Sequence, residues 1–156
     1  MKGNEIIVNP GINGPHGRIE PVIVDGTPKP GTCMQLKAAV AADQGKFTFE
    51  VFNLAADGDP APVVVLLADD MIGKLATDAY VTGTIGDVYW PCIGDELNML
   101  VDASLGAIAI GDKFSIDDGT GKLIAGGAGA LTFQALEAVA DPAADVHVHC
   151  RCIRNC

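Results

Sequence analysis

Positive charge is scarce in this chain of 156 residues, which has 10 Lys and Arg against 20 Asp and Glu and a formal net charge of −10. A nucleic-acid partner is excluded on this ground, because such binding needs cations that displace counterions from phosphates. Long hydrophobic runs are also missing. The longest, residues 61–68, has 8 residues, whereas a membrane-spanning helix needs about 20. We therefore expect no nucleic-acid partner and no membrane partner.

Serine is nearly absent, with only Ser104 and Ser115, and neither lies in a Gly-x-Ser-x-Gly elbow. Histidine is limited to His16, His147 and His149, so nucleophilic catalysis has few candidate residues. The Asp117–Gly121 segment resembles part of a calcium loop but lacks its bidentate glutamate. We expect no enzymatic activity and no cofactor or metal.

Few polar side chains are available to cover the surface. Charged residues are 19% of the chain and hydrophobic residues 49%, while an average domain has about 25% charged residues. The sequence therefore predicts a homo-oligomer, in which other chains cover part of the apolar surface. Five cysteines, an odd number, do not indicate a disulfide framework. No secretory leader is evident, and we expect synthesis in a reducing cytoplasm.

The first 31 residues form a distinct region, because they hold five of the nine prolines and six glycines. This composition excludes a continuous helix. Two short β-prone runs interrupt it and predict an extended N-terminal arm over residues 1–31 that binds another protein, with residues 32–156 as a single β-rich domain. The alternative is that both runs are strands of the chain's own sheet. The candidate arm contacts are Ile6, Ile7, Val8, Pro10, Val22, Ile23 and Val24.

Beyond residue 32 the pattern is mostly β. Residues 47–51 alternate as a half-buried strand, with Phe52 as an exception on the outer face, and residues 63–67 indicate a strand covered on both sides. Gly-Asp pairs at Gly86, Gly94 and Gly111 suggest turns that begin strands. Residues 108–124 contain a hairpin, and residues 131–139 pair with 146–153 across a turn, with a bulge near Ala135.

Helix is expected only in short pieces. A short helix is predicted after Asp69-Asp70, while residues 95–105 and 37–42 are compatible with either helix or strand. The fold class is therefore all-β, mainly β with one or two short helices, as a compact β-barrel or sandwich.

The C-terminal His147–Cys152 segment combines imidazoles and thiols. In a strand, Cys150 and Cys152 point to one side and His147, His149 and Arg151 to the other, so the two ligand types cannot share one metal ion. The cysteines are then core residues. The face formed by His147, His149 and Arg151 is a candidate subunit interface, and its histidines would make assembly sensitive to pH.

Two similarities to known families suggest different functions. Residues 83–89 and Gly94-Asp95-Glu96 loosely resemble the trimeric all-β nucleotide pyrophosphatases of the dUTPase family. The second similarity spans most of the chain: residues 3–10, 17–26, 94–97, 110–123 and 133–138 resemble, in pattern and order, bacteriophage capsid decoration (cement) proteins.

The decoration-protein resemblance implies a small β-tulip-like domain on the outer surface of the virion. Such proteins are often trimers, and they clamp adjacent major capsid protein subunits. The major capsid protein and further copies of the chain are the implied partners. Deleting residues 2–24 is then expected to leave a folded oligomer that no longer decorates heads. A carbohydrate-binding β module of a head fibre or adhesin is the alternative, and a nucleotide pyrophosphatase is a further one.

Overall fold

The computed structural model describes residues 7–9 (backbone only), 17–37, 47–53, 63–68, 75–126 and 132–154. Within these residues the chain is almost entirely β, as predicted, and its helical structure is one 3-10 turn. The elements are β1 (Ile7–Asn9), β2 (Arg18–Val24), β3 (Cys33–Leu36), β4 (Thr48–Val51), β5 (Val64–Leu66), β6 (Ile85–Trp90), β7 (Glu96–Val101), η2 (Ala103–Leu105), β8 (Lys113–Ile116), β9 (Leu123–Ala125), β10 (Phe133–Ala135) and β11 (Val146–Cys152). No helix in the described part is long and apolar enough to cross a membrane.

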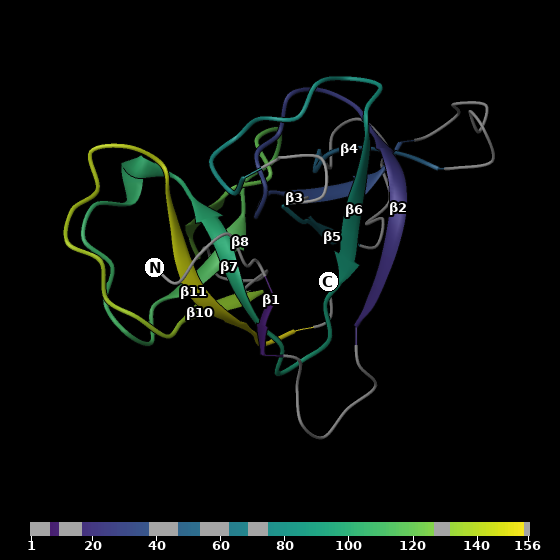
Figure 1. Ribbon diagram of the computed structural model, residues 1–156. Helices are drawn as coiled ribbons and strands as arrows, with labels where there is room; N and C mark the ends of the chain where they lie inside the picture. The colour runs from purple at the N-terminus through teal and green to yellow at the C-terminus, as the bar shows by residue number, and fades with distance from the viewer. Residues whose placement is uncertain are drawn as a thin grey trace.

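The strands form two rings that lie beside each other (Figure 1). The N-terminal barrel is a closed ring in the order β2-β4-β3-β5-β6. The C-terminal barrel has the order β7-β11-β10-β8-β9 and is closed by the pairing of β7 with β9, while β1 adds to the start of β7. In each ring one pairing is parallel: β2 with β4, and β7 with β9.

Two hydrophobic cores follow from the alternation of side chains along the strands. In β5, Val64 and Leu66 point into the N-terminal barrel, whereas Val65 points the opposite way, into the core of the C-terminal barrel. Phe52, which follows β4, is also buried in that second core, so the prediction that it lies on the outer face is wrong. The double-sided burial predicted for residues 63–67 is confirmed.

The predicted pairings are confirmed for strands that are neighbours in the sequence. β8 and β9 form the predicted hairpin, and β10 pairs with β11 in an antiparallel ladder that joins Phe133 to Cys152. The ambiguous segment from residue 95 to residue 105 is strand β7 followed by η2. Gly86 lies inside β6 and not in a turn, and Tyr80 and Val24 leave no room for a side chain there. The segments 69–74 and 38–42, for which helix was considered, lie outside the described residues. The predicted helix was to continue through Ala79, but residues 75–79 form a turn and no helix.

The two barrels are joined by backbone hydrogen bonds from two connecting segments. In the strap of residues 26–32, the carbonyl of Gly31 accepts from the amide of Leu100 in β7, while its amide donates to Leu66 in β5. In the β8–β9 turn, the amide of Gly119 donates to Phe52 and the carbonyl of Gly121 accepts from Cys33. The bonds to Leu100, Phe52 and Cys33 attach each barrel to a loop of the other, while the bond to Leu66 holds the strap on its own barrel.

Candidate functional site

The outer face of β2 and β6 carries a row of apolar side chains, and Asp87 lies opposite Pro21 on the same face. Ile19, Pro21 and Ile23 alternate along β2 with the inward-pointing Val22 and Val24, and Ile85 lies opposite Ile23 in register. Ile19 is 55% exposed and Ile85 is 46% exposed. We call these four residues, Ile19, Pro21, Ile23 and Ile85, the β2/β6 outer face. Exposed apolar surface on a closed barrel is a feature of protein contact sites.

The predicted arm is only partly an arm. β2 pairs with β6 along six positions and with β4 on its other side, and Val22 and Val24 are fully buried. The interpretation of residues 18–31 as a separate arm, and of Val22 and Val24 as capsid contacts, is therefore wrong. The alternative, a strand of the chain's own sheet, holds for β2. An apolar run marks a strand that will be buried, but it does not say by which partner.

The remaining arm contacts are placed differently. Ile7 and Val8 lie in β1, which pairs with the beginning of β7, so this run too has a partner within the chain. Ile23 is half-buried on the outer face of β2. Ile6 and Pro10 lie outside the described residues. Any contact of these residues with a capsid stays a prediction.

The face of His147, His149 and Arg151 does not form one open surface. The predicted alternation is confirmed, since Val148, Cys150 and Cys152 are buried on the other side. His147, however, is only 7% exposed, and its Nε2 lies 2.8 Å from the Pro30 carbonyl oxygen. The strap covers it, so its assignment to a subunit interface is wrong. Burial lowers the pKa of His147, although the Pro30 contact opposes this.

The other two members of this face contact one carboxylate. Arg151 donates to Glu96 Oε1 at 2.8 Å, and His149 Nε2 lies 3.3 Å from Glu96 Oε2. The hydrogen bond from Arg151 is the main reason that the pKa of Glu96 is lowered. These contacts cross from β11 to β7 and stabilise the C-terminal barrel from outside.

The segment that resembles a nucleotide pyrophosphatase contains a structural carboxylate. Asp95 is completely buried and accepts hydrogen bonds from the Tyr89 hydroxyl at 2.7 Å and from the Cys92 amide at 2.8 Å. Burial, followed by the hydrogen bond to Asp95, raises the pKa of Tyr89. The carboxylate therefore orders the turn before β7. No group of three or more His, Cys, Asp or Glu side chains suited to a metal ion occurs in the described ranges.

Cys150 and Cys152 are core residues, as predicted, and so is Cys33. Cys33, Cys150 and Cys152 are fully buried free thiols, and burial raises the pKa of Cys33 and of Cys150. Cys92 is half-buried beside Asp95. A thiol that resists ionisation is a poor nucleophile, so these residues contribute packing. Cys156 lies outside the described residues.

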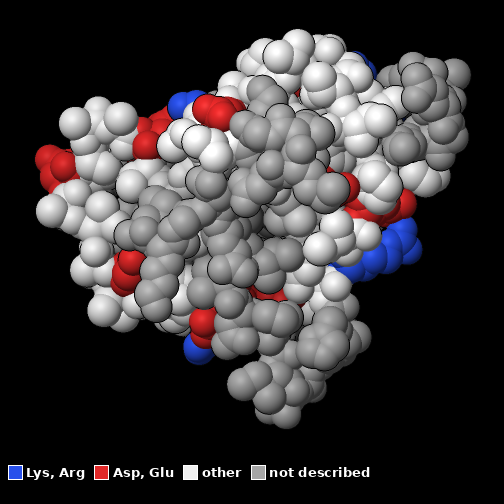
Figure 2. All heavy atoms as spheres, viewed as in Figure 1, with Lys and Arg blue, Asp and Glu red and all other residues white. Residues whose placement is uncertain are grey.

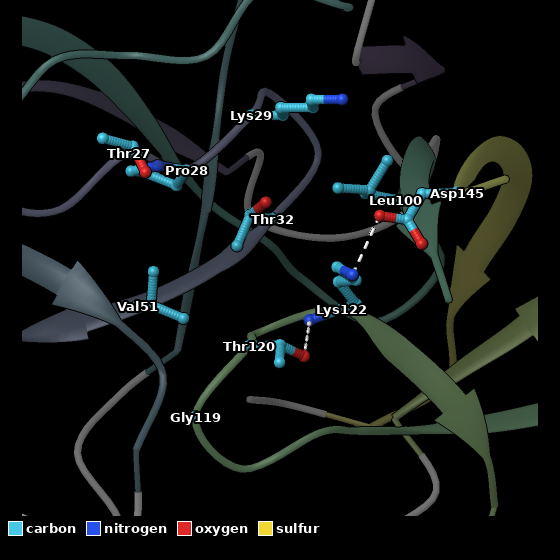
Figure 3. A pocket seen from close by; sticks show the side chains of 10 residues that line it. All are labelled: Thr27, Pro28, Lys29, Thr32, Val51, Leu100, Gly119, Thr120, Lys122 and Asp145. Carbon is cyan, nitrogen blue, oxygen red and sulfur yellow. Dashed lines mark hydrogen bonds and ion pairs between the residues drawn. The ribbon is translucent and has the colours of Figure 1, made fainter. Parts of the chain in front are cut away.

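A small cavity of about 220 Å³ opens where the two barrels meet (Figure 3). The sequence did not suggest it, because its walls come from five separate segments. Its apolar part consists of Pro28, Val51 and Leu100. The polar part and the turn glycine are Thr27, Lys29, Thr32, Gly119, Thr120, Lys122 and Asp145.

Lys122 holds the polar side of this cavity together. Its ammonium group lies 2.8 Å from Asp145 and 3.2 Å from Asp102, and the hydrogen bond to Asp145 raises its pKa. Hydrogen bonds from Ser104, together with Lys122, lower the pKa of Asp102 to about 2. Lys122 and Asp102 therefore remain charged around neutral pH.

Charged groups cover only part of the surface. In the view of Figure 2, uncharged atoms cover the top of the molecule, where the segment of residues 75–84 runs in Figure 1. That segment includes Val81, which is 59% exposed, and Leu75, which is 44% exposed. The apolar surface predicted from composition is thus present on the folded chain.

The comparisons with known proteins concern the fold. No protein family and no curated protein matches the sequence. Among solved structures, the chain is similar to the head fibre gp8.5 N base in bacteriophage phi29, with a TM-score of 0.50 and 9% sequence identity. The similarity covers 90% of this chain and 99% of the other. At this identity the likeness concerns the fold, and it extends over nearly the whole of both chains.

Proposed function

We propose that this protein is a structural component of a bacteriophage head, made in the host cytoplasm and located on the outer surface of the capsid. The observation that carries the proposal is the likeness in fold to a phage head fibre base over almost the full length of both chains. The resemblance of the sequence to capsid decoration proteins points independently to the same location. The net charge of −10 suits a protein that does not contact the packaged genome.

The partner in this proposal is the major capsid protein, and the β2/β6 outer face is the contact surface. Its isoleucines stand on a rigid, closed barrel, so they lose little conformational freedom on binding. Burial of such side chains contributes about 25 cal/mol per Å² of apolar area removed from water. A single face of this size binds weakly, and several linked copies would bind far more tightly.

Clamping by a trimer is the form that best uses this face. Three copies on a threefold position would engage neighbouring capsid subunits together, and each later contact would be intramolecular. We expect a native mass of three chains, measured by light scattering coupled to gel filtration. A monomer at all concentrations would contradict the trimer. Binding to heads is tested separately, by co-sedimentation.

Co-sedimentation with expanded, undecorated phage heads tests the attachment. Ile19→Lys and Ile85→Lys place a charge on the β2/β6 outer face, and we expect at least about a tenfold loss of binding for each, because a lysine ammonium cannot be buried against an apolar partner without a large desolvation cost. The matched control is Ile110→Lys, since Ile110 is 69% exposed in a turn of the other barrel.

The results distinguish an error in the proposed function from an error in the proposed contact surface. If the unmodified chain fails to sediment with heads of its own phage, the proposed function is wrong. If it sediments and all three variants bind equally, the contact lies elsewhere. A structural role also predicts no turnover of nucleoside triphosphates with Mg²⁺, which a pyrophosphate-release assay measures, and steady release would favour the pyrophosphatase alternative.

A further inference from the structure

The cavity between the barrels offers hydrogen-bond donors that the fold does not use. An ammonium group has three donors, and those of Lys122 are directed to Asp145 and Asp102 at 2.8 and 3.2 Å. The third donor of Lys122 has no partner among the residues that the structure describes. Figure 3 shows Lys122 between Thr120 and Asp145 in the wall of the cavity.

Lys29 adds a second cation at the edge of the same cavity. It is exposed, and it has no ion-pair or side-chain hydrogen-bond partner among the residues that the structure describes. By contrast, Arg18, Lys37 and Arg151 each contact a carboxylate. With Lys29, Lys122 and Asp145, the lining has two positive charges and one negative charge.

The rest of the lining is suited to a hydroxylated ring. Val51, Leu100 and Pro28 provide an apolar wall, and Thr27, Thr32 and Thr120 line the remainder. The Thr120 hydroxyl already donates to Asp117, so towards a ligand it can only accept. Asp145 uses one carboxylate oxygen for Lys122 and the other for the amide of Ala103, and each oxygen can accept a further bond. An apolar wall with a few fixed polar groups is typical of small-molecule sites.

We propose that this cavity binds one acidic sugar unit, a pyranose ring that carries a carboxylate. The C–H face of the ring packs on Val51 and Leu100, its hydroxyls bind the threonines and Asp145, and its carboxylate binds Lys29 and the remaining donor of Lys122. A volume of about 220 Å³ is the space of about seven water molecules in the liquid, which admits a single ring. The proposal does not depend on attachment to a phage head.

Amide NMR titration of the intact protein with glucuronate tests this site, with glucose and acetate as comparison ligands. We expect saturable shifts in residues 27–32 and 119–122, with a dissociation constant of about 1 mM. Glucose lacks the charge and acetate lacks the ring, so each should bind at least about fivefold more weakly. Because the ligand contacts both barrels, it should also raise the melting temperature.

Two matched variants test whether the charge of Lys29 binds the ligand's carboxylate. Lys29→Gln should weaken glucuronate binding about fivefold to tenfold, while Lys113→Gln removes the same charge from an exposed position of β8 outside the cavity and should change nothing. The absence of saturable shifts would overturn the proposal, as would equal affinities for acetate and glucuronate or equal effects of the two variants. Lys29→Gln should still bind heads, so failure of this site and failure of the proposed function are distinguishable.

Discussion

At the scale of single residues, the junction between the barrels depends on positions that have no room for a side chain. Gly121 has a φ of +64°, and a Cβ built on it would lie 2.2 Å from the carbonyl oxygen of Cys33. That contact is with backbone, which cannot rotate away. The same carbonyl accepts the amide of Phe52, so displacing it disturbs the attachment of β3 to the end of β4.

Gly121→Ala should therefore lower the free energy of unfolding by about 3 kcal/mol, measured by urea denaturation. The control is Gly119→Ala in the same turn. Gly119 also has a positive φ, of +98°, but nothing lies within 4 Å of its Cβ position, so only backbone strain of about 1 kcal/mol is expected. Equal losses for the two variants would show that the close approach to Cys33 is unimportant.

His147 makes the same junction sensitive to acid. Its pKa in the folded protein is below the ordinary value of 6.5, mainly because the ring is buried, with the nearby charge of Lys29 acting in the same direction. At a pH between the folded and the unfolded pKa of His147, the unfolded chain therefore binds a proton that the folded chain does not bind. Stability from this residue is complete above pH 6.5 and decreases as the pH falls below that value.

We expect the free energy of unfolding to fall between about pH 7 and about pH 5 by up to about 1.4 kcal/mol per pH unit from this one group. The measurement is a series of urea denaturations across this range. His147→Gln should flatten the slope whatever its absolute stability, while the contributions of the other titrating groups remain. Parallel curves for the two proteins would contradict the role of His147.

At the scale of elements, the sequence pattern predicts strands that have close neighbours in the chain. The β8–β9 hairpin and the β10–β11 pair were predictable because their turns and their alternating residues are local. Residues 95–105 were ambiguous, because leucines and valines there satisfy both periods. The structure resolves them as strand because β7 is paired with β11 along six positions, a contact over about fifty residues that no local pattern contains.

The main error in the prediction from sequence concerns the partner of β2. The proline- and glycine-rich segment around Val22 and Val24 offers no local hairpin partner, so the pattern predicted an external partner, whereas β6 and β4 bury them inside the chain. For the same reason the β2/β6 outer face and the cavity were not predicted: each combines residues that are distant in sequence.

Truncations distinguish the two N-terminal strands. Deleting residues 2–24 removes β2 and opens the N-terminal barrel, so we expect loss of the β circular-dichroism signal and aggregation, in contrast to the folded oligomer that composition alone suggests. Deleting residues 2–9 removes only β1, which pairs with β7 at two register positions, and should leave a folded chain. A folded product of the longer deletion would show that β2 is dispensable.

At the scale of the whole molecule, the two barrels share one of their cores. The larger core contains Met99 and Leu123 from the C-terminal barrel together with Val65 and Tyr89 from outward positions of the N-terminal barrel. Unfolding either barrel alone would expose this shared surface to water, at a cost of about 25 cal/mol per Å² of apolar area. The two rings should therefore unfold together.

Trp90 provides the test, because it is the only tryptophan in the chain and lies in β6 of the N-terminal barrel. It contacts Phe49 edge to face, with ring centroids 6.3 Å apart. Its fluorescence should report the same urea midpoint as the NMR methyl signals of Met99 and Leu123 in the other barrel. An earlier fluorescence transition would mean that the N-terminal barrel unfolds independently.

The closed N-terminal ring determines how copies of this protein contact one another at high density. A strand with a vacant side is a template on which another polypeptide can extend the sheet, and β2 to β6 each have partners on both sides. Neighbouring copies held at high density would therefore meet through side chains and not by merging their backbones. Such associations can be released and formed again, whereas fused sheets grow into fibres.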